Sequence, residues 1–105
     1  MWQQEEKLQP GMMRKLISGD KLMLVSMEID PGTPIPPHSH PHEQISYIVA
    51  GEAEFTIGDE VRSMKAGDVC LIPGGVPHSV KVLSKLIVLD CFSPPREDFL
   101  KGGKS

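Results

Sequence analysis

Residues 31–58 read PGTPIPPHSHPHEQISYIVAGEAEFTIG, a proline-rich segment followed by two stretches of strand character. Near the end of it, Ala53, Phe55 and Ile57 alternate with polar side chains, and a period of two is typical of a half-buried strand. The prolines at the start remove backbone donors and fix φ, so we expect a rigid, extended edge or loop there and no central strand. These prolines are Pro31, Pro34, Pro36, Pro37 and Pro41.

The rest of the chain carries similar turn signals. With 10 glycines and 10 prolines in 105 residues, a helical bundle or coiled coil is excluded. Turns recur about every 8 to 12 residues, which is typical of a sandwich or barrel. We expect a single domain over 1–105, with its core at about 11–93 and a C-terminal arm at 94–105 whose last residues, KGGKS, fray. The expected strands cover residues 12–17, 21–29, 44–49, 52–57, 60–64, 69–72, 77–83 and 85–92.

Charge and hydropathy exclude several classes of protein. The net charge is −3 and the 11 Lys and Arg form no basic run, so no nucleic-acid partner is expected. No apolar run approaches the roughly 18 to 20 residues that span a bilayer, and the start, MWQQEEKL, has no signal-peptide pattern, so we expect a cytoplasmic protein without a membrane partner. Cys70 and Cys91 are too far apart for a CxxC site and are interpreted as buried, reduced thiols.

The expected last strand contains a carboxylate in apolar surroundings. In KLIVLDCF, residues 85–92, both faces are apolar, so the strand should lie between two layers. Asp90 falls on the same face as Val88 and Phe92. A carboxylate there must be paired or serve chemistry.

Three of the four histidines have a spacing that suits a metal. His38 and His40 are two residues apart, so in an extended segment both side chains leave the same face, and Gln44 keeps that parity. His78 follows a Pro-Gly-Gly turn at the start of another expected strand. Three imidazoles and an amide oxygen suit a divalent first-row metal such as Ni, Zn, Mn, Co or Fe. The alternative is that His-x-His is a solvated surface pair.

The spacing of these residues resembles the two motifs of the cupin superfamily over about residues 20–92. The two elements read Gly32-x5-His38-x-His40-x3-Gln44-x6-Gly51 and Gly67-x5-Pro73-x-Gly75-x2-His78-x3-Val82. The resemblance implies an all-β, single-domain jelly-roll barrel with a metal held by His38, His40, Gln44 and His78. Two positions depart from the motifs, because Gln44 stands for the usual Glu and Val82 for the usual Asn.

The amide ligand and its neighbours bear on the chemistry. A neutral ligand set leaves the charge of the ion uncompensated, which makes it a stronger Lewis acid, and does not supply the two-histidine, one-carboxylate triad of iron oxygenases. Glu43 has the wrong parity for the interior and is interpreted as a solvated side chain. His42 shares the ligand parity but follows Pro41, so it is either a neighbour of the ligands or a surface residue.

The C-terminal segment narrows the resemblance. Asp90, Phe92 and Arg96 form a D-x-F-x3-R pattern which, with HSHPHEQ and GEAEFTIG, resembles the small cupins of the pectin-degradation protein type, where a Gln in the first motif is expected. Those proteins convert 4,5-unsaturated monouronates to linear keto forms. The resemblance implies that Asp90 moves protons, Phe92 packs on the sugar ring and Arg96 binds the uronate carboxylate.

Several alternatives stay open at this point. Asp90 can be a structural carboxylate paired with a lysine, and Arg96 can sit in an exposed tail with local ion pairs. The barrel can be a non-catalytic binder of a sugar acid, or a metal-dependent dioxygenase, which would require iron and oxygen consumption. A homodimer is expected because a small barrel gains by burying an exposed edge.

Overall fold

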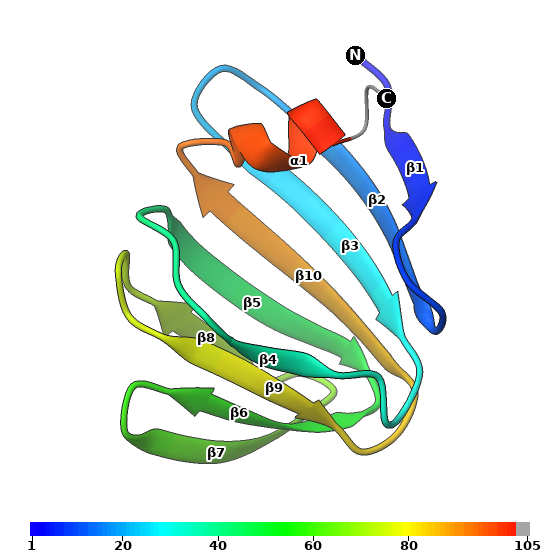
Figure 1. Ribbon diagram of the computed structural model, residues 1–105, viewed down its shortest axis with the longest axis vertical. Coiled ribbons are helices and arrows are strands. Elements are labelled where there is room, and N and C mark those ends of the chain that lie inside the picture. Colours follow the sequence, from blue (N-terminus) through cyan, green and yellow to red (C-terminus); the bar gives the residue numbers. More distant parts are fainter. Residues whose placement is uncertain (103–105) are drawn as a thin grey trace.

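A computed structural model of the chain describes residues 1–102, with side chains as far as residue 100, and it is almost entirely β (Figure 1). The elements are β1 (Gln4–Lys7), β2 (Met12–Ser18), β3 (Met23–Ile29), β4 (Ile35–His38), β5 (Glu43–Ala50), β6 (Glu52–Ile57), β7 (Glu60–Lys65), β8 (Val69–Ile72), β9 (His78–Val82), β10 (Leu86–Ser93) and α1 (Glu97–Gly102). The expected all-β class is confirmed. Of the KGGKS tail, residues 103–105 lie outside the described part.

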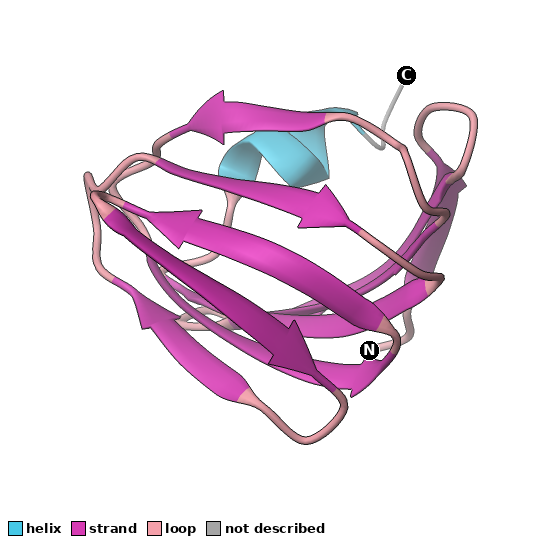
Figure 2. Cartoon of the chain, turned by 90° about the horizontal axis from the view of Figure 1, so that it is seen from below, coloured by secondary structure: helices cyan, strands magenta, loops and turns pink. Residues whose placement is uncertain are grey.

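The strands form two sheets whose pairs are antiparallel. The larger sheet has the order β1-β2-β3-β10-β5-β8, and the smaller has the order β4-β9-β6-β7. Figure 2 shows the strands of both sheets curving around a common interior. This arrangement is consistent with the jelly roll that the resemblance implies.

The core lies between the sheets because alternate residues of each strand point inward. In β5 the inward positions are Gln44, Ser46 and Ile48, all buried, while the residues between them are exposed. In β10 the inward side chains of Leu86, Val88 and Phe92 pack into the core, on the same face as Asp90. Gln44, Ser46 and Asp90 therefore point into the space between the sheets while their backbones stay in regular strands.

The eight expected strands are all present, with ends within two residues of those predicted. The proline-rich segment is an extended edge, as expected, and part of it is strand β4, which pairs with β9 through an irregular register. Sequence patterns did not indicate β1, a short strand of four polar residues, or α1. Both lie at the ends of the chain, where few residues are available to set a period.

Turns between the strands use glycine where backbones approach closely. Gly51 joins β5 to β6 with φ of 88°, and a Cβ there would overlap the carbonyl oxygen of Lys85.

Cys70 and Cys91 are free thiols, as expected, but they are half-buried and not fully buried. Burial raises the pKa of the Cys70 thiol. Within the described residues, no helix has the length and apolarity needed to cross a membrane.

Candidate metal centre

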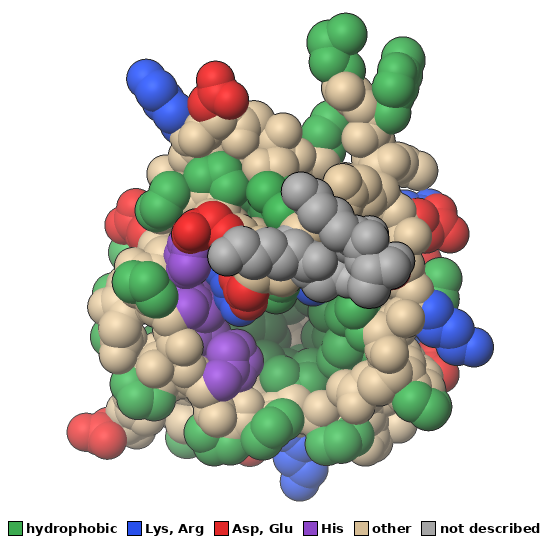
Figure 3. Space-filling model, turned by 45° about the horizontal axis from the view of Figure 1, so that its top comes forward, with side chains coloured by type: hydrophobic (Ala, Val, Ile, Leu, Met, Phe, Trp, Pro, Cys, Tyr) green, Lys and Arg blue, Asp and Glu red, His purple; other side chains and the backbone are tan. Residues whose placement is uncertain are grey.

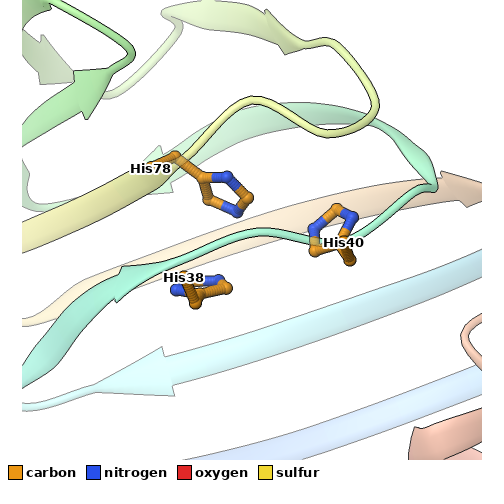
Figure 4. Close-up of side chains that lie close together, drawn as sticks. All are labelled: His38, His40 and His78. Carbon is orange, nitrogen blue, oxygen red and sulfur yellow. The ribbon is translucent and has the colours of Figure 1, made fainter.

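Three histidines converge at one end of the space between the sheets (Figure 4). His38 ends β4 and His78 begins β9, and the two face each other in the strand register. His40 lies in the loop that follows β4. Their ligand nitrogens all lie within 4.8 Å of one another. His40 and His78 are buried, with 8% and 4% of their surface exposed, while His38 is exposed.

Hydrogen bonds to backbone carbonyl oxygens orient all three rings. Each Nδ1 lies at a main-chain carbonyl oxygen, and because a carbonyl only accepts, each Nδ1 must carry its hydrogen and each Nε2 must be free when the ring is neutral. This arrangement is usual for metal-binding histidines. The contacts are His38 Nδ1 to Pro36 O at 2.9 Å, His40 Nδ1 to His42 O at 3.1 Å, and His78 Nδ1 to Val76 O at 2.9 Å.

The free nitrogens face other acceptors or nothing. The Nε2 of His78 is buried without a hydrogen-bond partner among the described residues. The Nε2 of His40 lies 3.0 Å from Oε1 of Gln44, which is also an acceptor. Burial lowers the pKa of both imidazoles, which favours the neutral form with its lone pair on Nε2.

A bound metal ion would resolve this arrangement of facing acceptors. His40 Nε2 and Gln44 Oε1, which lie 3.0 Å apart, would both direct lone pairs at the ion instead of at each other. The orphaned Nε2 of His78 would supply another ligand. His38, His40, Gln44 and His78 therefore fit a divalent cation.

A carboxylate is connected to this ligand set through one hydroxyl. Gln44 Nε2 donates to Ser46 Oγ at 3.0 Å, and Ser46 Oγ donates to Asp90 Oδ1 at 2.6 Å. Burial raises the pKa of Asp90 to about 6, against the lowering effect of its hydrogen bonds and of the Arg96 charge. No lysine among the described side chains pairs with Asp90, so the lysine-paired alternative does not describe it.

Arg96 lies at the start of the arm that leads into α1. Its Nε and Nη2 donate to the two carboxylate oxygens of Asp98 at 3.0 and 2.8 Å. Its guanidinium carbon lies 4.2 Å from the ring centre of Phe99 and 5.1 Å from that of Phe92. The local ion pair that we considered from sequence is therefore present, but only 12% of the Arg96 side chain is exposed.

One cavity of about 120 Å³ joins most of these groups. In Figure 3 the histidines gather along one side of a hollow with apolar side chains inside it. Six of the seven site residues predicted from sequence line the cavity. The seventh, His40, lies behind Gln44, with its Nε2 3.0 Å from Gln44 Oε1. Those six are His38, Gln44, His78, Asp90, Phe92 and Arg96.

The structure also shows where Glu43 and His42, the sequence neighbours of the candidate ligands, are located. Glu43 is exposed. His42 is buried beside the ligands, its carbonyl oxygen accepts from His40, and its Nε2 lies 3.7 Å from Glu97 Oε1. Sequence reasoning missed Ser46 and Phe99. The parity of Ser46 with Gln44 could have indicated the first, but no sequence signal pointed to the second.

The comparisons with known proteins agree with this geometry. The sequence profile of the cupin domain matches residues 25–92. The chain belongs to the cupin family. It is 39% identical over 98 residues to the pectin degradation protein KdgF of Dickeya dadantii (strain 3937), covering 90% of this chain and 89% of that protein. The resemblance to small cupins of the pectin-degradation type is thereby confirmed.

Solved structures of other cupins superpose closely on the chain. The structure of KdgF from Halomonas sp. matches with a TM-score of 0.86 and 33% identity, over 91% of this chain and 90% of that one. Oxalate decarboxylase of Bacillus subtilis, in a structure described by its Mn(II) centres, matches with a TM-score of 0.80 and 24% identity. That match covers 91% of this chain and 29% of the decarboxylase, and it supports the cupin fold alone.

Proposed function

We propose that this cupin converts 4,5-unsaturated monouronates to linear keto forms by ring opening and ketonisation. The observation that carries the proposal is that candidate metal ligands, a partly buried carboxylate and an arginine line one cavity. The relative named as a pectin degradation protein supports the same substrate class. The ion would be Ni, Zn, Mn, Co or Fe, held by His38, His40, Gln44 and His78.

The positions of the residues support the roles that the resemblance implies. When bound, the ion supplies Lewis-acid polarisation of substrate oxygens. Asp90 lines the cavity and would take a proton from one substrate atom and deliver it to another. Asp98 binds Nε and Nη2 of Arg96, which leaves Nη1 for a substrate carboxylate. Phe92 would pack on the sugar ring and exclude water.

The test follows the loss of the conjugated double-bond absorbance of an unsaturated monouronate. We expect the metal-loaded protein to accelerate this decay over the spontaneous rate. Asp90→Asn should lower kcat by about 10² to 10⁴-fold because it removes the proton carrier, and Arg96→Ala should mainly raise KM. Glu43→Gln, at an exposed carboxylate, is the matched control and should leave both constants unchanged.

Two outcomes would favour the other functions. A metal-loaded protein without acceleration, but with calorimetric binding of uronates, would make it a non-catalytic sugar-acid binder. Oxygen consumption by an iron-loaded protein would make it a dioxygenase. The ligand set argues against the second outcome because it contains no carboxylate.

We also propose that two copies of the chain associate through the outer face of the larger sheet. This face carries six large apolar side chains that are between 44% and 60% exposed: Leu24, Ile45, Tyr47, Val49, Val69 and Leu71. Ile45 pairs with Leu71 and Tyr47 with Val69 across β5 and β8. Leu24 on β3 lies in the same row as Ile45, with Cys91 of β10 between them. A stable interface takes roughly 800 Å² from each partner, a size that a patch spanning four strands can supply.

Light scattering coupled to gel filtration tests this association. We expect a dimer for the native chain and a monomer for Tyr47→Lys combined with Leu71→Lys. The control is Val61→Lys, on β7 of the smaller sheet, where the side chain is 55% exposed. A monomeric native chain at micromolar concentration would rule the dimer out.

A further inference from the structure

Ser46 stands between the metal ligands and Asp90, although no sequence motif marks it. It lies in β5 two residues after Gln44, faces Asp90 in the register with β10, and is 0% exposed. Its hydroxyl contacts both side chains, at 3.0 Å from Gln44 Nε2 and 2.6 Å from Asp90 Oδ1. Because a buried hydroxyl must satisfy its hydrogen bonds within the protein, it constrains the orientation of the two polar side chains beside it.

When Asp90 is ionised, the donors and acceptors along this chain of contacts allow one direction only. A serine hydroxyl has a single proton, and the ionised Asp90 carboxylate can only accept, so the proton of Ser46 is directed to Asp90. The lone pairs of Ser46 are then left for Gln44, where only the amide nitrogen can donate to them. The amide oxygen of Gln44 must therefore point the other way, toward His40 Nε2.

We propose that Ser46 is a positioning residue that fixes the Gln44 amide with its oxygen toward the metal, an inference that rests on the proposed metal centre. An amide flip would place the Gln44 oxygen against the lone pairs of Ser46 and lose a buried hydrogen bond. Glutamate at position 44 would have no N–H for Ser46, and two carboxylates would compete for one hydroxyl proton. The glutamine ligand and Ser46 thus form a matched pair.

The affinity for Co(II), measured by competition with a chromophoric chelator, tests this role. Ser46→Ala should weaken Co(II) binding by about 10-fold or more, the usual cost of losing a partner of a metal ligand. In a Gln44→Ala background the same substitution should cause no further loss, because Ser46 acts through Gln44. Equal losses in both backgrounds, or no loss in the native background, would overturn the proposal.

A second measurement uses the metal-free protein. The side-chain NH₂ signal of Gln44 in ¹H–¹⁵N spectra should exchange slowly with solvent in the native chain and rapidly in Ser46→Ala, while the dispersed backbone signals confirm folding. Rapid exchange in both proteins would contradict the fixed amide. Neither measurement involves turnover. If the protein does not convert the uronate but both measurements give the expected results, the proposed reaction is wrong and the proposed role of Ser46 is still supported.

Discussion

The metal centre and the C-terminal arm meet in one cavity, but they are held in different ways. Each imidazole of the candidate metal centre is oriented by a main-chain carbonyl, on strand ends and on a loop that contains prolines. The arm is held by side chains, since Arg96 pairs with Asp98 and stacks on Phe99 within four residues. The position of the ligands is therefore set by the fold, whereas the position of Arg96 depends on whether α1 is docked.

Removal of a metal ligand should give the largest effect. His78→Ala deletes a buried Nε2 that has no hydrogen-bond partner in the described part of the chain. We expect metal affinity to fall by more than about 100-fold, beyond the loss typical for partners of ligands. Chelator competition and elemental analysis measure this. His42→Ala is the control, because His42 is another buried histidine but lies outside the group of three converging imidazoles. A stoichiometric ion in His78→Ala would show that the three imidazoles are not the centre.

A substitution at Gly74 should show that the backbone fixes the positions of the candidate metal ligands. Gly74 lies against the loop that carries His40, and a Cβ there would overlap the carbonyl oxygen of Pro41. The neighbouring Gly75 amide donates to the His40 carbonyl at 2.8 Å, so this loop cannot move without disturbing the ligand. We expect Gly74→Ala to destabilise the protein by about 1–3 kcal/mol and to weaken metal binding.

Urea unfolding and chelator competition check both effects. Gly19→Ala is the matched control, since its Cβ would meet Leu22 at 3.6 Å, an ordinary contact, and its change should stay within about 0.5 kcal/mol. If Gly74→Ala destabilises the protein but leaves metal affinity unchanged, this loop does not determine the positions of the candidate ligands.

The contrast between the two regions also explains what the sequence could predict. The strands and three of the four candidate ligands were inferred from parity, because residues two apart in an extended segment share a face, as His38, His40 and Gln44 would. Asp90 stood out since a carboxylate on an apolar strand face has few roles. These inferences need only local backbone geometry, which the spacing of residues carries.

Contacts between distant side chains could not be predicted in the same way. Ser46 and Asp90 are 44 residues apart, and their pairing depends on the register of β5 with β10. Phe99 is placed by Arg14 on β2, whose guanidinium carbon lies 4.0 Å from the ring centre. α1 has six residues, too few for a helical period to show in the sequence.

Loss of the aromatic anchor should loosen the arm and spare the metal centre. The ring of Phe99 lies between the guanidinium groups of Arg14 and Arg96 and meets Phe92 edge-on, with ring centres 5.7 Å apart. Phe99→Ala should cost about 1–2 kcal/mol of stability, less than a fully buried ring, and raise KM for the uronate. Co(II) affinity should not change.

Phe99→Leu separates packing from stacking. It keeps an apolar side chain but has no ring face for Arg14 or Arg96, so stability should recover more than KM does. If Phe99→Ala weakens Co(II) binding as strongly as it affects KM, the two regions are not independent and the comparison fails.

The smallest effect should come from the ion pair of the arm. Hydrogen bonds from Arg96 hold the pKa of Asp98 below its ordinary value, and burial opposes this only in part. The pair therefore stabilises the folded chain above the ordinary aspartate pKa of about 3.9, and this contribution is lost as pH falls through the lower pKa of the folded state. Because 58% of the Asp98 side chain is exposed, we expect less than about 1 kcal/mol.

Urea unfolding of the native chain and of Asp98→Asn, compared from neutral to acid pH, tests the sign of this effect. The native chain should be slightly more stable at neutral pH, and the difference should close only in the acid range below the ordinary aspartate pKa. A gap that persists or widens in acid would mean that Asp98 does not act through its charge. In that case Arg96 would be held by Phe92 and Phe99, through contacts that do not titrate, and the arm would resemble the metal centre more closely than its ion pair suggests.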